Sequence, residues 1–323
     1  MDQVSKSLLM LKLLMRWLRR FWPDCLQSAY VTFGREEQKM PASKFAAITG
    51  STGGIGSAIA SQLAANGWGL LLVNRNTQKA EHQRRQLLQS FPDAAVELFA
   101  ADLMDTLQIL RVSQEIQNRF PSIDALYNNS GVLTSQRANS LQGHESNYAV
   151  NTLAPYILIK KLRAALSRSE GAAETMIINT TSSAQNAVKS LDVNGLSNPE
   201  TIGGLTGAYA ATKLALTAMG SAMSESLAAD GIKIRSVDPG PVVTPMTKTS
   251  DAMPGILRLL VPFLFGKPEK QARKMINAAN PGEFGGRSGI YISNGKERAI
   301  PHLALEPSVQ ASLICKLEAD AVA

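Results

Sequence analysis

Apolar residues along the chain form two recurring patterns, short continuous runs and longer stretches with helical spacing. The continuous runs have the length of strands and cover residues 45–49, 69–73, 95–100, 123–128, 175–180 and 232–237, with a shorter run at 290–292. Stretches with apolar residues three and four positions apart lie at 55–66, 77–90, 106–119, 148–166 and 209–229. Strands that alternate with helices pair in parallel and are covered on both faces. The pattern therefore predicts a single doubly wound α/β domain with strand order 3-2-1-4-5-6-7.

Two long segments, residues 184–208 and 245–274, interrupt this alternation, and each contains several Gly or Pro residues. Long irregular segments in a compact domain are more often functional than accidental. We expect residues 245–274 to form a substrate-loop region, with the apolar run 255–263 as a mobile lid or, alternatively, an ordinary amphipathic surface helix. The predicted organisation is an N-terminal helix at 1–22, a linker at 23–43, a catalytic domain at 44–300 and a C-terminal tail at 301–323.

The N-terminal segment combines an apolar stripe with basic residues. On a helix, one side carries Leu8, Leu11, Met15, Leu18 and Trp22, and the sector beside it carries Lys12, Arg16, Arg19 and Arg20. Such a helix suits the surface of an anionic membrane, so we predict peripheral membrane contact through residues 8–22. Packing against the domain or a partner subunit is the alternative. No run of about 18 apolar residues is present, and a transmembrane helix is not predicted.

The composition is that of an ordinary globular protein, with 45% hydrophobic and 18% charged residues. The net charge of +7 comes largely from the N-terminal segment, and it does not indicate nucleic-acid binding. Cys25 and Cys315 belong to no CxxC or Cys/His cluster, so we expect no metal site and no disulfide framework. These features predict a reducing compartment, either the cytoplasm or the cytoplasmic face of a membrane.

A glycine-rich turn follows the first predicted strand and opens the first predicted helix. It reads Thr49-Gly50-Ser51-Thr52-Gly53-Gly54-Ile55-Gly56. Backbone N–H groups at a helix N-terminus bind phosphate when no Cβ atom blocks the approach. Gly50 would permit the tight turn, Gly54 the approach of the phosphates, and Gly56 the packing of the helix on the sheet. The position of the turn in a βαβ unit indicates a dinucleotide site that also includes Ser51, Thr52 and Ile55.

The end of the second strand discriminates between NAD(H) and NADP(H). A carboxylate there would bind the adenosine ribose and repel a 2′-phosphate, but the chain has Asn74 and Arg75 instead. Arg75 can make a charge-assisted contact to that phosphate, so we predict NADP(H) rather than NAD(H). After the third strand, Asp102 and Leu103 are expected near the adenine, or Asp102 caps the next helix.

Tyr209 and Lys213 are the candidate catalytic pair. A spacing of four places both on one face of a helix. A phenol can protonate the oxygen that hydride transfer leaves on a carbonyl carbon, and a nearby ammonium would lower the pKa of that phenol. Two adjacent serines, Ser182 and Ser183, follow the fifth strand, where a hydroxyl can bind the substrate oxygen. Spacing does not separate these two serines.

Taken together and in order, these motifs resemble the short-chain dehydrogenases/reductases over residues 44 to about 292. Further matches are Asn128, Asn129, Ser130 and Gly131 after the fourth strand, Asn151, Pro239, Gly240, Val242 and Thr244. The resemblance implies a Rossmann-type domain and a homo-oligomer. It selects Ser183 as the serine that polarises the substrate and Tyr209 as the general acid/base. It also implies that Lys213 binds the nicotinamide ribose, that Asn151 holds a water in the proton relay, and that Pro239, Gly240, Val242 and Thr244 border the nicotinamide.

Two departures refine this resemblance. Ser130 stands where the family usually has alanine, and the interval from Ser183 to Tyr209 is longer than in compact members. That insertion, Arg75 and the stretch after Leu260 are similar to the retinol dehydrogenase and protochlorophyllide reductase branch, whose members act on large lipophilic molecules. We therefore expect an NADP(H)-dependent oxidoreductase that acts on a carbonyl or alcohol of a small lipophilic substrate. The alternatives are a C=C reductase and a non-catalytic NADP(H)-sensing protein.

Overall fold

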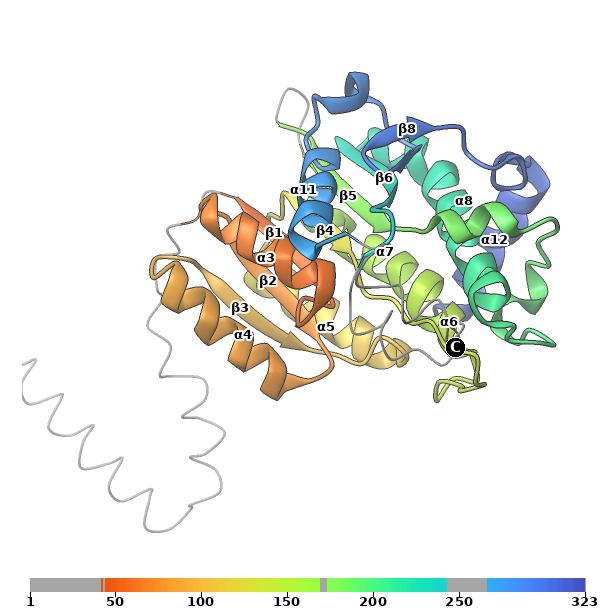
Figure 1. The fold of residues 1–323 in the computed structure, drawn as a ribbon, viewed down its shortest axis with the longest axis horizontal. Helices are drawn as coiled ribbons and strands as arrows, with labels where there is room; N and C mark the ends of the chain where they lie inside the picture. The colour runs from red at the N-terminus through yellow and green to blue at the C-terminus, as the bar shows by residue number, and fades with distance from the viewer. Residues whose placement is uncertain (1–41, 43, 169–172, 243–265, 323) are drawn as a thin grey trace, which may run out of the picture. The chain divides into compact units, whose positions relative to one another are not determined.

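The computed structural model describes residues 42, 44–168, 173–242 and 266–322, and these residues form one α/β domain (Figure 1). The predicted N-terminal helix, the linker and Thr244 lie outside the described residues, as does most of the predicted substrate-loop region. The sheet has strand order β3-β2-β1-β4-β5-β6-β7-β8. Its strands are β1 Phe45–Thr49, β2 Gly69–Asn74, β3 Val96–Ala100, β4 Ala125–Asn128, β5 Thr175–Thr180, β6 Ile232–Asp238, β7 Ile290–Ser293 and β8 Lys296–Arg298.

The predicted order 3-2-1-4-5-6-7 is confirmed, and all pairs up to β7 are parallel. The short edge strand β8, which the sequence pattern did not predict, pairs antiparallel to β7. β1 and β2 read as continuous apolar runs because helices cover both faces of the sheet. This topology places the carboxyl ends of the central strands side by side, where open α/β sheets bind ligands.

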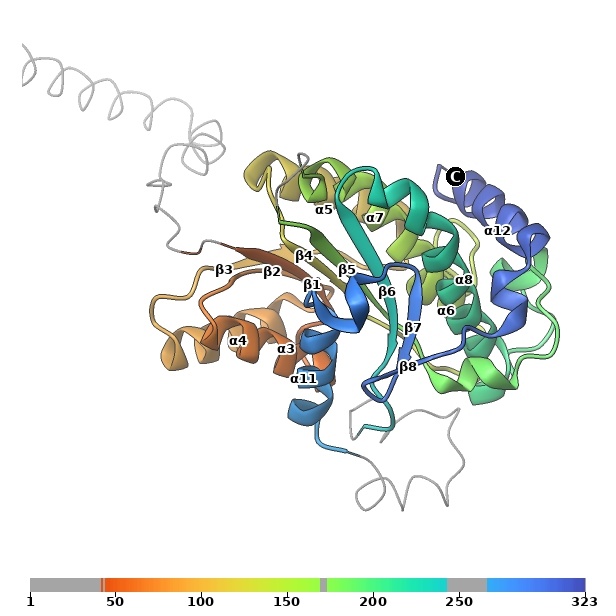
Figure 2. The same ribbon diagram turned by 90° about the horizontal axis from the view of Figure 1, so that it is seen from above.

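Helices cover the two faces of the sheet (Figure 2). One face carries α3 Gly54–Ala65, α4 Thr77–Ser90 and α11 Pro268–Ala278. The other carries α5 Thr106–Arg119, α7 Ala154–Leu166 and α8 Ala208–Ala228, with α6 Ser146–Tyr148 beside α8 and α12 Pro307–Asp320 farther out. Short 3-10 turns η2 Ser183–Ala187, η3 Asn194–Ser197 and η4 Gly204–Thr206 lie in the predicted interruption between β5 and α8, and η5 Glu283–Gly286 and η6 His302–Leu305 flank β7 and β8. In the part of the chain that is described, no helix has the length and apolar character needed to cross a membrane.

Three local predictions need correction. The single helix predicted at 148–166 is divided by a π-helical turn, η1 Ala149–Leu153. Pro155 has no N–H to donate to the carbonyl four residues earlier, and its ring crowds that carbonyl, so regular α-helical bonding is interrupted here. The predicted loop region 245–274 ends within α11, and the predicted tail 301–323 contains α12. Both helices have Pro at their N-terminal end, a favourable position for it.

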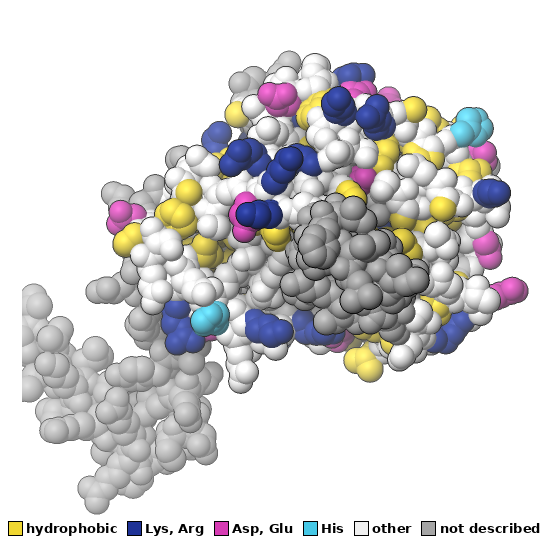
Figure 3. All heavy atoms as spheres, viewed as in Figure 1, with side chains coloured by type: hydrophobic (Ala, Val, Ile, Leu, Met, Phe, Trp, Pro, Cys, Tyr) yellow, Lys and Arg dark blue, Asp and Glu magenta, His cyan; other side chains and the backbone are white. Residues whose placement is uncertain are grey.

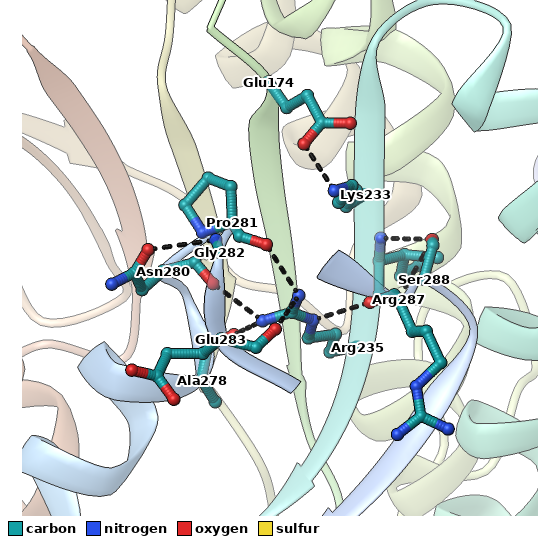
Figure 4. A network of polar contacts seen from close by, with 11 residues as sticks. Glu174, Lys233, Arg235, Ala278, Asn280, Pro281, Gly282, Glu283, Arg287 and Ser288 are labelled. Atoms are coloured by element: carbon teal, nitrogen blue, oxygen red, sulfur yellow. Dashed lines mark hydrogen bonds and ion pairs between the residues drawn. The ribbon is translucent and has the colours of Figure 1, made fainter. Parts of the chain in front are cut away.

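Arg235, in the middle of β6, is fully buried and fixes the segment that follows α11 (Figure 4). Its guanidinium donates hydrogen bonds of 2.8–3.2 Å to the carbonyl oxygens of Ala278, Asn280, Pro281, Glu283 and Arg287. Burial lowers the pKa of Arg235, but the group stays protonated because its reference pKa is so high. The neighbouring Lys233 instead forms a more peripheral ion pair with Glu174 (Figure 4). Arg235 thus joins the end of α11 and the segment between α11 and β7 to strand β6.

Candidate active site

A cavity of about 870 Å³ opens where the central strands end. Its lining begins at the turn after β1, continues past the ends of β2, β4 and β5, and reaches α8 and the loop after β6. Most of the predicted site residues that are described line this one space. They are Gly50, Thr52, Gly54, Ile55, Asn74, Arg75, Asp102, Leu103, Asn129, Ser130, Gly131, Ser182, Ser183, Tyr209, Lys213, Pro239, Gly240 and Val242.

Close packing explains the glycines of the turn after β1. Gly50 has a positive φ of 66°, and a Cβ atom there would lie 2.7 Å from Ser130 Oγ. A Cβ atom on Gly56 would lie 2.3 Å from the carbonyl oxygen of Gly50. The Asn129 side chain donates to the carbonyl oxygens of Thr49 and Gly50 and holds the turn from the side of β4. Any side chain at Gly50 or Gly56 would therefore force this turn apart.

The N-terminus of α3 has the properties of an anion site. Its N-cap, Gly53, supplies no side-chain cap, and its first turn contains no acidic residue. Gly53, Gly54 and Ile55 also line the cavity. The first N–H groups of a helix lack partners within the helix, and the helix dipole favours negative charge beside them. A pyrophosphate fits this end of the cavity, which is the requirement for a dinucleotide cofactor.

Two of the predicted cofactor residues, Ser51 and Gly56, do not line the cavity and instead contact other parts of the protein. Ser51 is fully buried, and its hydroxyl donates to Gln83 Oε1 at 2.9 Å and accepts from Asn74 Nδ2 at 2.9 Å. Gln83 Nε2 also donates to the Ser51 carbonyl. This network joins the turn to β2 and α4. The sequence pattern did not reveal it because Gln83 comes from a helix thirty-two residues away.

The connection from β2 into α4 brings two basic side chains to the cavity. Arg75 has a side chain that is 72% exposed, and its Nη1 lies 3.7 Å from Asp102 Oδ2. Lys79, in the first turn of α4, lines the same cavity and was not among the predicted residues. The available signal was its position in the first turn of the helix that follows Arg75 directly. Asp102 accepts a hydrogen bond from the Met104 N–H, while Asp105 is the N-cap of α5.

Tyr209 lies at the other end of the cavity, near the N-terminus of α8. Burial raises the pKa of its phenol to about 12, a hydrogen bond with Ser182 opposes that increase, and the negative charge of Asp238 adds to it. The sequence analysis expected a neighbouring ammonium to lower this pKa. The structure differs because removing the phenol from water has the larger effect.

Lys213 lies one turn after Tyr209 and is 3% exposed. Its Nζ donates to the Thr180 carbonyl at 2.8 Å and lies 5.8 Å from the centroid of the Tyr209 ring. Burial lowers the pKa of Lys213 to about 8. The hydroxyl of Thr181 donates to the Lys213 carbonyl, which ties this turn of α8 to the end of β5.

The two adjacent serines differ in their surroundings. The Ser182 side chain caps η2 by accepting from the Ala184 N–H, and it also hydrogen-bonds Tyr209. Ser183 is the first residue of η2, is exposed, and lines the same cavity. Both serines therefore line the cavity that contains Tyr209, Ser182 also affects the pKa of the phenol, and the assignment of Ser183 to the substrate oxygen stays a prediction.

Asn151 is fully buried in the π-helical turn η1. Its side chain accepts from the Val132 N–H at 2.8 Å and donates to the Val132 carbonyl at 3.0 Å. It also lies 3.2 Å from the hydroxyl of Thr212, which stands between Tyr209 and Lys213 in the sequence. Asn151 thus connects the segment after β4 with α8. The sequence analysis did not predict a role for Thr212, because its hydroxyl does not line the cavity but accepts a hydrogen bond from Asn151.

The loop after β6 closes the cavity with Pro239, Gly240 and Val242. Gly240 has a positive φ of 85°, and its N–H donates to Asp238 Oδ1 at 2.9 Å. The other carboxylate oxygen of Asp238 accepts from the Ser293 hydroxyl at 2.9 Å. Asp238 is 4% exposed and was not among the predicted site residues. Its carboxylate fixes the start of the loop that borders Tyr209.

Comparison with known proteins identifies the type of scaffold. The sequence model of a family described as short chain dehydrogenase matches residues 44–255. Human polyprenol dehydrogenase is 28% identical over 276 residues, which are 84% of this chain and 83% of that protein. Mouse retinol dehydrogenase 12 is 26% identical over 255 residues, 78% of each chain.

Solved structures agree on the fold. The 3-ketoacyl-(acyl-carrier-protein) reductase of Brucella melitensis, complexed with NADH, has a TM-score of 0.59 and 22% identity. The match covers 79% of this chain and 98% of that one. The L-sorbose reductase of Gluconobacter frateurii, complexed with NADPH and L-sorbose, has the same TM-score and identity and covers 79% and 96% of the two chains. Since one of these structures holds NADH and the other NADPH, the fold alone does not determine the nucleotide.

Proposed function

The chain belongs to the short-chain dehydrogenase/reductase family of oxidoreductases, and we propose that it is an NADP(H)-dependent enzyme that interconverts an alcohol and a carbonyl on a lipophilic substrate. The observation that carries this proposal is the contact between Tyr209 and Ser182 beside Lys213, in a cavity that continues to the uncapped N-terminus of α3. One end of the cavity fits a pyrophosphate, and the other offers a proton donor to a substrate oxygen.

The cofactor residues follow from the donors that line the cavity. The backbone of Gly53, Gly54 and Ile55 would hold the pyrophosphate. Arg75 and Lys79 would hold a 2′-phosphate, and the absence of a carboxylate from the end of β2 supports NADP(H) over NAD(H). When bound, the nicotinamide supplies or accepts the hydride.

Each catalytic side chain has a separate proposed role. Ser182 orients the substrate oxygen and the Tyr209 phenol, with which it shares a hydrogen bond. Tyr209 gives its proton to that oxygen during reduction and removes it during oxidation. Lys213 binds the nicotinamide ribose and supplies positive charge near the phenol. Asn151 positions the helix that carries Tyr209 and Lys213, through Thr212, and holds a water of the proton relay.

A lipophilic substrate is supported by the residues around Tyr209. Leu133, Val150, Ala184 and Leu205 line the same cavity as Tyr209. The names of two relatives specify a polyprenol and a retinol as substrates of those proteins. Apolar surface that a hydrocarbon chain covers is removed from water, which favours binding. We propose an alcohol or aldehyde on a long hydrocarbon chain as the substrate class.

We also propose that the protein forms a homo-oligomer. Independently, we propose that residues 8–22 make a peripheral contact with a membrane on its cytoplasmic side. The apolar stripe and the basic sector of that segment support the contact.

Replacing Tyr209 tests the proposed chemistry. Tyr209→Phe keeps the ring but removes the hydroxyl, and we expect kcat for carbonyl reduction with NADPH to fall about 100-fold or more, with little change in NADPH affinity. Product analysis by mass spectrometry should show an alcohol. Unchanged turnover in Tyr209→Phe would contradict the role of the phenol, and a product with a reduced C=C bond would contradict the reaction type.

A further inference from the structure

The solvent-facing side of α11 and the adjacent edge strand β8 carry a concentration of positive charge (Figure 3). We call this surface the α11 basic face and define it by the exposed residues Lys267, Lys270, Arg273, Lys296 and Arg298. The opposite side of α11 is buried through Gln271, Ala272, Met275 and Ala278. The helix is therefore fixed on the domain by one side and presents the basic side to its surroundings.

Few acidic groups compensate this charge. Glu269 is the single acidic residue of α11, and α3, which lies against α11, contains no charged residue. Glu297 of β8 pairs with Arg287. None of the five cations of the α11 basic face forms an ion pair with another residue of the described ranges. Burial and the adjacent Lys270 both lower the pKa of Lys274, as expected where positive charges repel one another.

The α11 basic face is connected directly to the rim of the cavity. The Gly266 N–H donates to the Pro241 carbonyl at 3.0 Å, and Gly266 pairs with Val242 in a short bridge. Pro241 and Val242 line the cavity, and α11 begins two residues after Gly266. A surface that binds α11 would therefore be held close to this side of the cavity.

We propose that the α11 basic face docks on the anionic surface of a lipid bilayer. Lys and Arg side chains have long, flexible stems, and each adds to the attraction toward anionic headgroups without requiring a shaped partner. Protein interfaces, by contrast, are enriched in aromatic residues and depleted in Lys, and the α11 basic face has three lysines and no aromatic residue. The site differs from residues 8–22, and docking does not depend on the proposed chemistry, although a lipophilic substrate would partition into the same bilayer.

Vesicle binding by the full-length chain tests this proposal. Sedimentation with phosphatidylcholine vesicles, with and without phosphatidylserine, measures the partition coefficient. The triple variant Lys267→Gln/Lys270→Gln/Arg273→Gln should bind phosphatidylserine vesicles roughly tenfold or more weakly, since each cation near the surface contributes to attraction. The matched control, Arg111→Gln/Lys161→Gln/Lys189→Gln, removes the same charge from exposed positions on other elements and should change binding less than about twofold.

The following results of the vesicle experiment would overturn the proposal. Equal weakening in both triple variants would show that overall charge, not this face, attracts the chain. Unchanged binding in the first variant, or equal binding to vesicles with and without phosphatidylserine, would show that the α11 basic face is not the contact. Reduction of a water-soluble carbonyl without vesicles should be the same in both variants and the parent chain. Failure of the proposed function would instead appear as no turnover in any of them.

Discussion

At the scale of single residues, the turn that follows β5 gives two adjacent serines different surroundings. Ser182 caps η2 and contacts the Tyr209 phenol, whereas Ser183 begins η2. The sequence predicted only that a serine hydroxyl follows β5. It did not predict which of the two hydroxyls faces Tyr209, because the direction of each side chain depends on the turn that follows the strand. The sequence analysis selected Ser183 from the family resemblance, and the contact in the structure supports Ser182.

Alanine substitution separates the two serines. Ser182→Ala removes a donor beside the reacting oxygen, and we expect kcat to fall roughly 100-fold. Ser183→Ala should lower kcat less than about fivefold, since the hydroxyl contact to Tyr209 stays in place. Steady-state kinetics with NADPH and one carbonyl substrate provides the measurement. The reverse order of effects would restore Ser183 as the substrate-binding serine.

The pKa values of Lys213 and Tyr209 predict how the rate of carbonyl reduction depends on pH. A Lys213 pKa of about 8 means that most of the ammonium is charged below pH 8 and that most of it has lost its proton above that pH. With a pKa of about 12, Tyr209 keeps its proton through this range and can act as an acid. We expect kcat/KM for carbonyl reduction to be constant below pH 8 and to fall about tenfold per pH unit above it.

The corresponding control is Lys213→Met, which has no group that titrates at this position. Its activity should be low at every pH and should show no decline that begins near pH 8. A decline at the same pH in both proteins would assign the titration to another group.

At the scale of the elements, α11 and α12 extend the domain beyond what periodicity predicted. Both helices bury few of their residues, in α12 only Leu313 and Leu317, and packing on the domain is what identifies the buried side. α12 contacts the segment before η1, since Asp320 accepts a hydrogen bond of 2.7 Å from the Tyr148 hydroxyl and lies 3.0 Å from Lys316 Nζ. The C-terminal helix therefore supports the start of the interrupted helix that carries Asn151.

Arg235 gives a stability prediction for the connection between α11 and β7. Arg235→Met leaves five carbonyl groups, which are buried or partly buried, without their donor, so the free energy of unfolding should fall by about 3 kcal/mol or more. Lys233→Met is the matched control on the same strand and breaks an ion pair with a partly exposed partner, at a cost of about 1 kcal/mol or less. Urea titration monitored by circular dichroism measures both. Equal losses would mean that the Arg235 contacts add little.

At the scale of the whole molecule, one cavity brings together groups from distant parts of the chain. They come from the turn after β1, from the segments that follow β2, β3, β4, β5 and β6, and from α8. Such a site is shared by the entire sheet, so ligand binding at it should stabilise the domain as a unit. The glycine turn and Arg75 are far from Tyr209 in sequence, and the parallel order of the strands is what makes them one site.

Nucleotide binding therefore predicts a shift in thermal stability. At about 100 times its Kd, a nucleotide adds about 2.7 kcal/mol of stability, enough to raise Tm by several degrees. NADPH should raise Tm more than NADH at equal concentration. In Arg75→Ala/Lys79→Ala, the two nucleotides should raise Tm equally, because the cations expected to bind the 2′-phosphate are gone. A larger shift with NADH in the parent chain would contradict the NADP(H) assignment.

The sequence alone determined the alternation of strands and helices, the strand order, the glycine turn and the placement of Tyr209 and Lys213 on one helical face. These features depend on local spacing, backbone freedom and the handedness of βαβ connections, which short stretches of sequence contain. Only the tertiary structure decided that Ser182 contacts Tyr209, that Ser51 faces Gln83 instead of the cavity, and that burial raises the pKa of Tyr209. These features depend on which side chains from distant segments occupy the same space, and on the water that their packing removes.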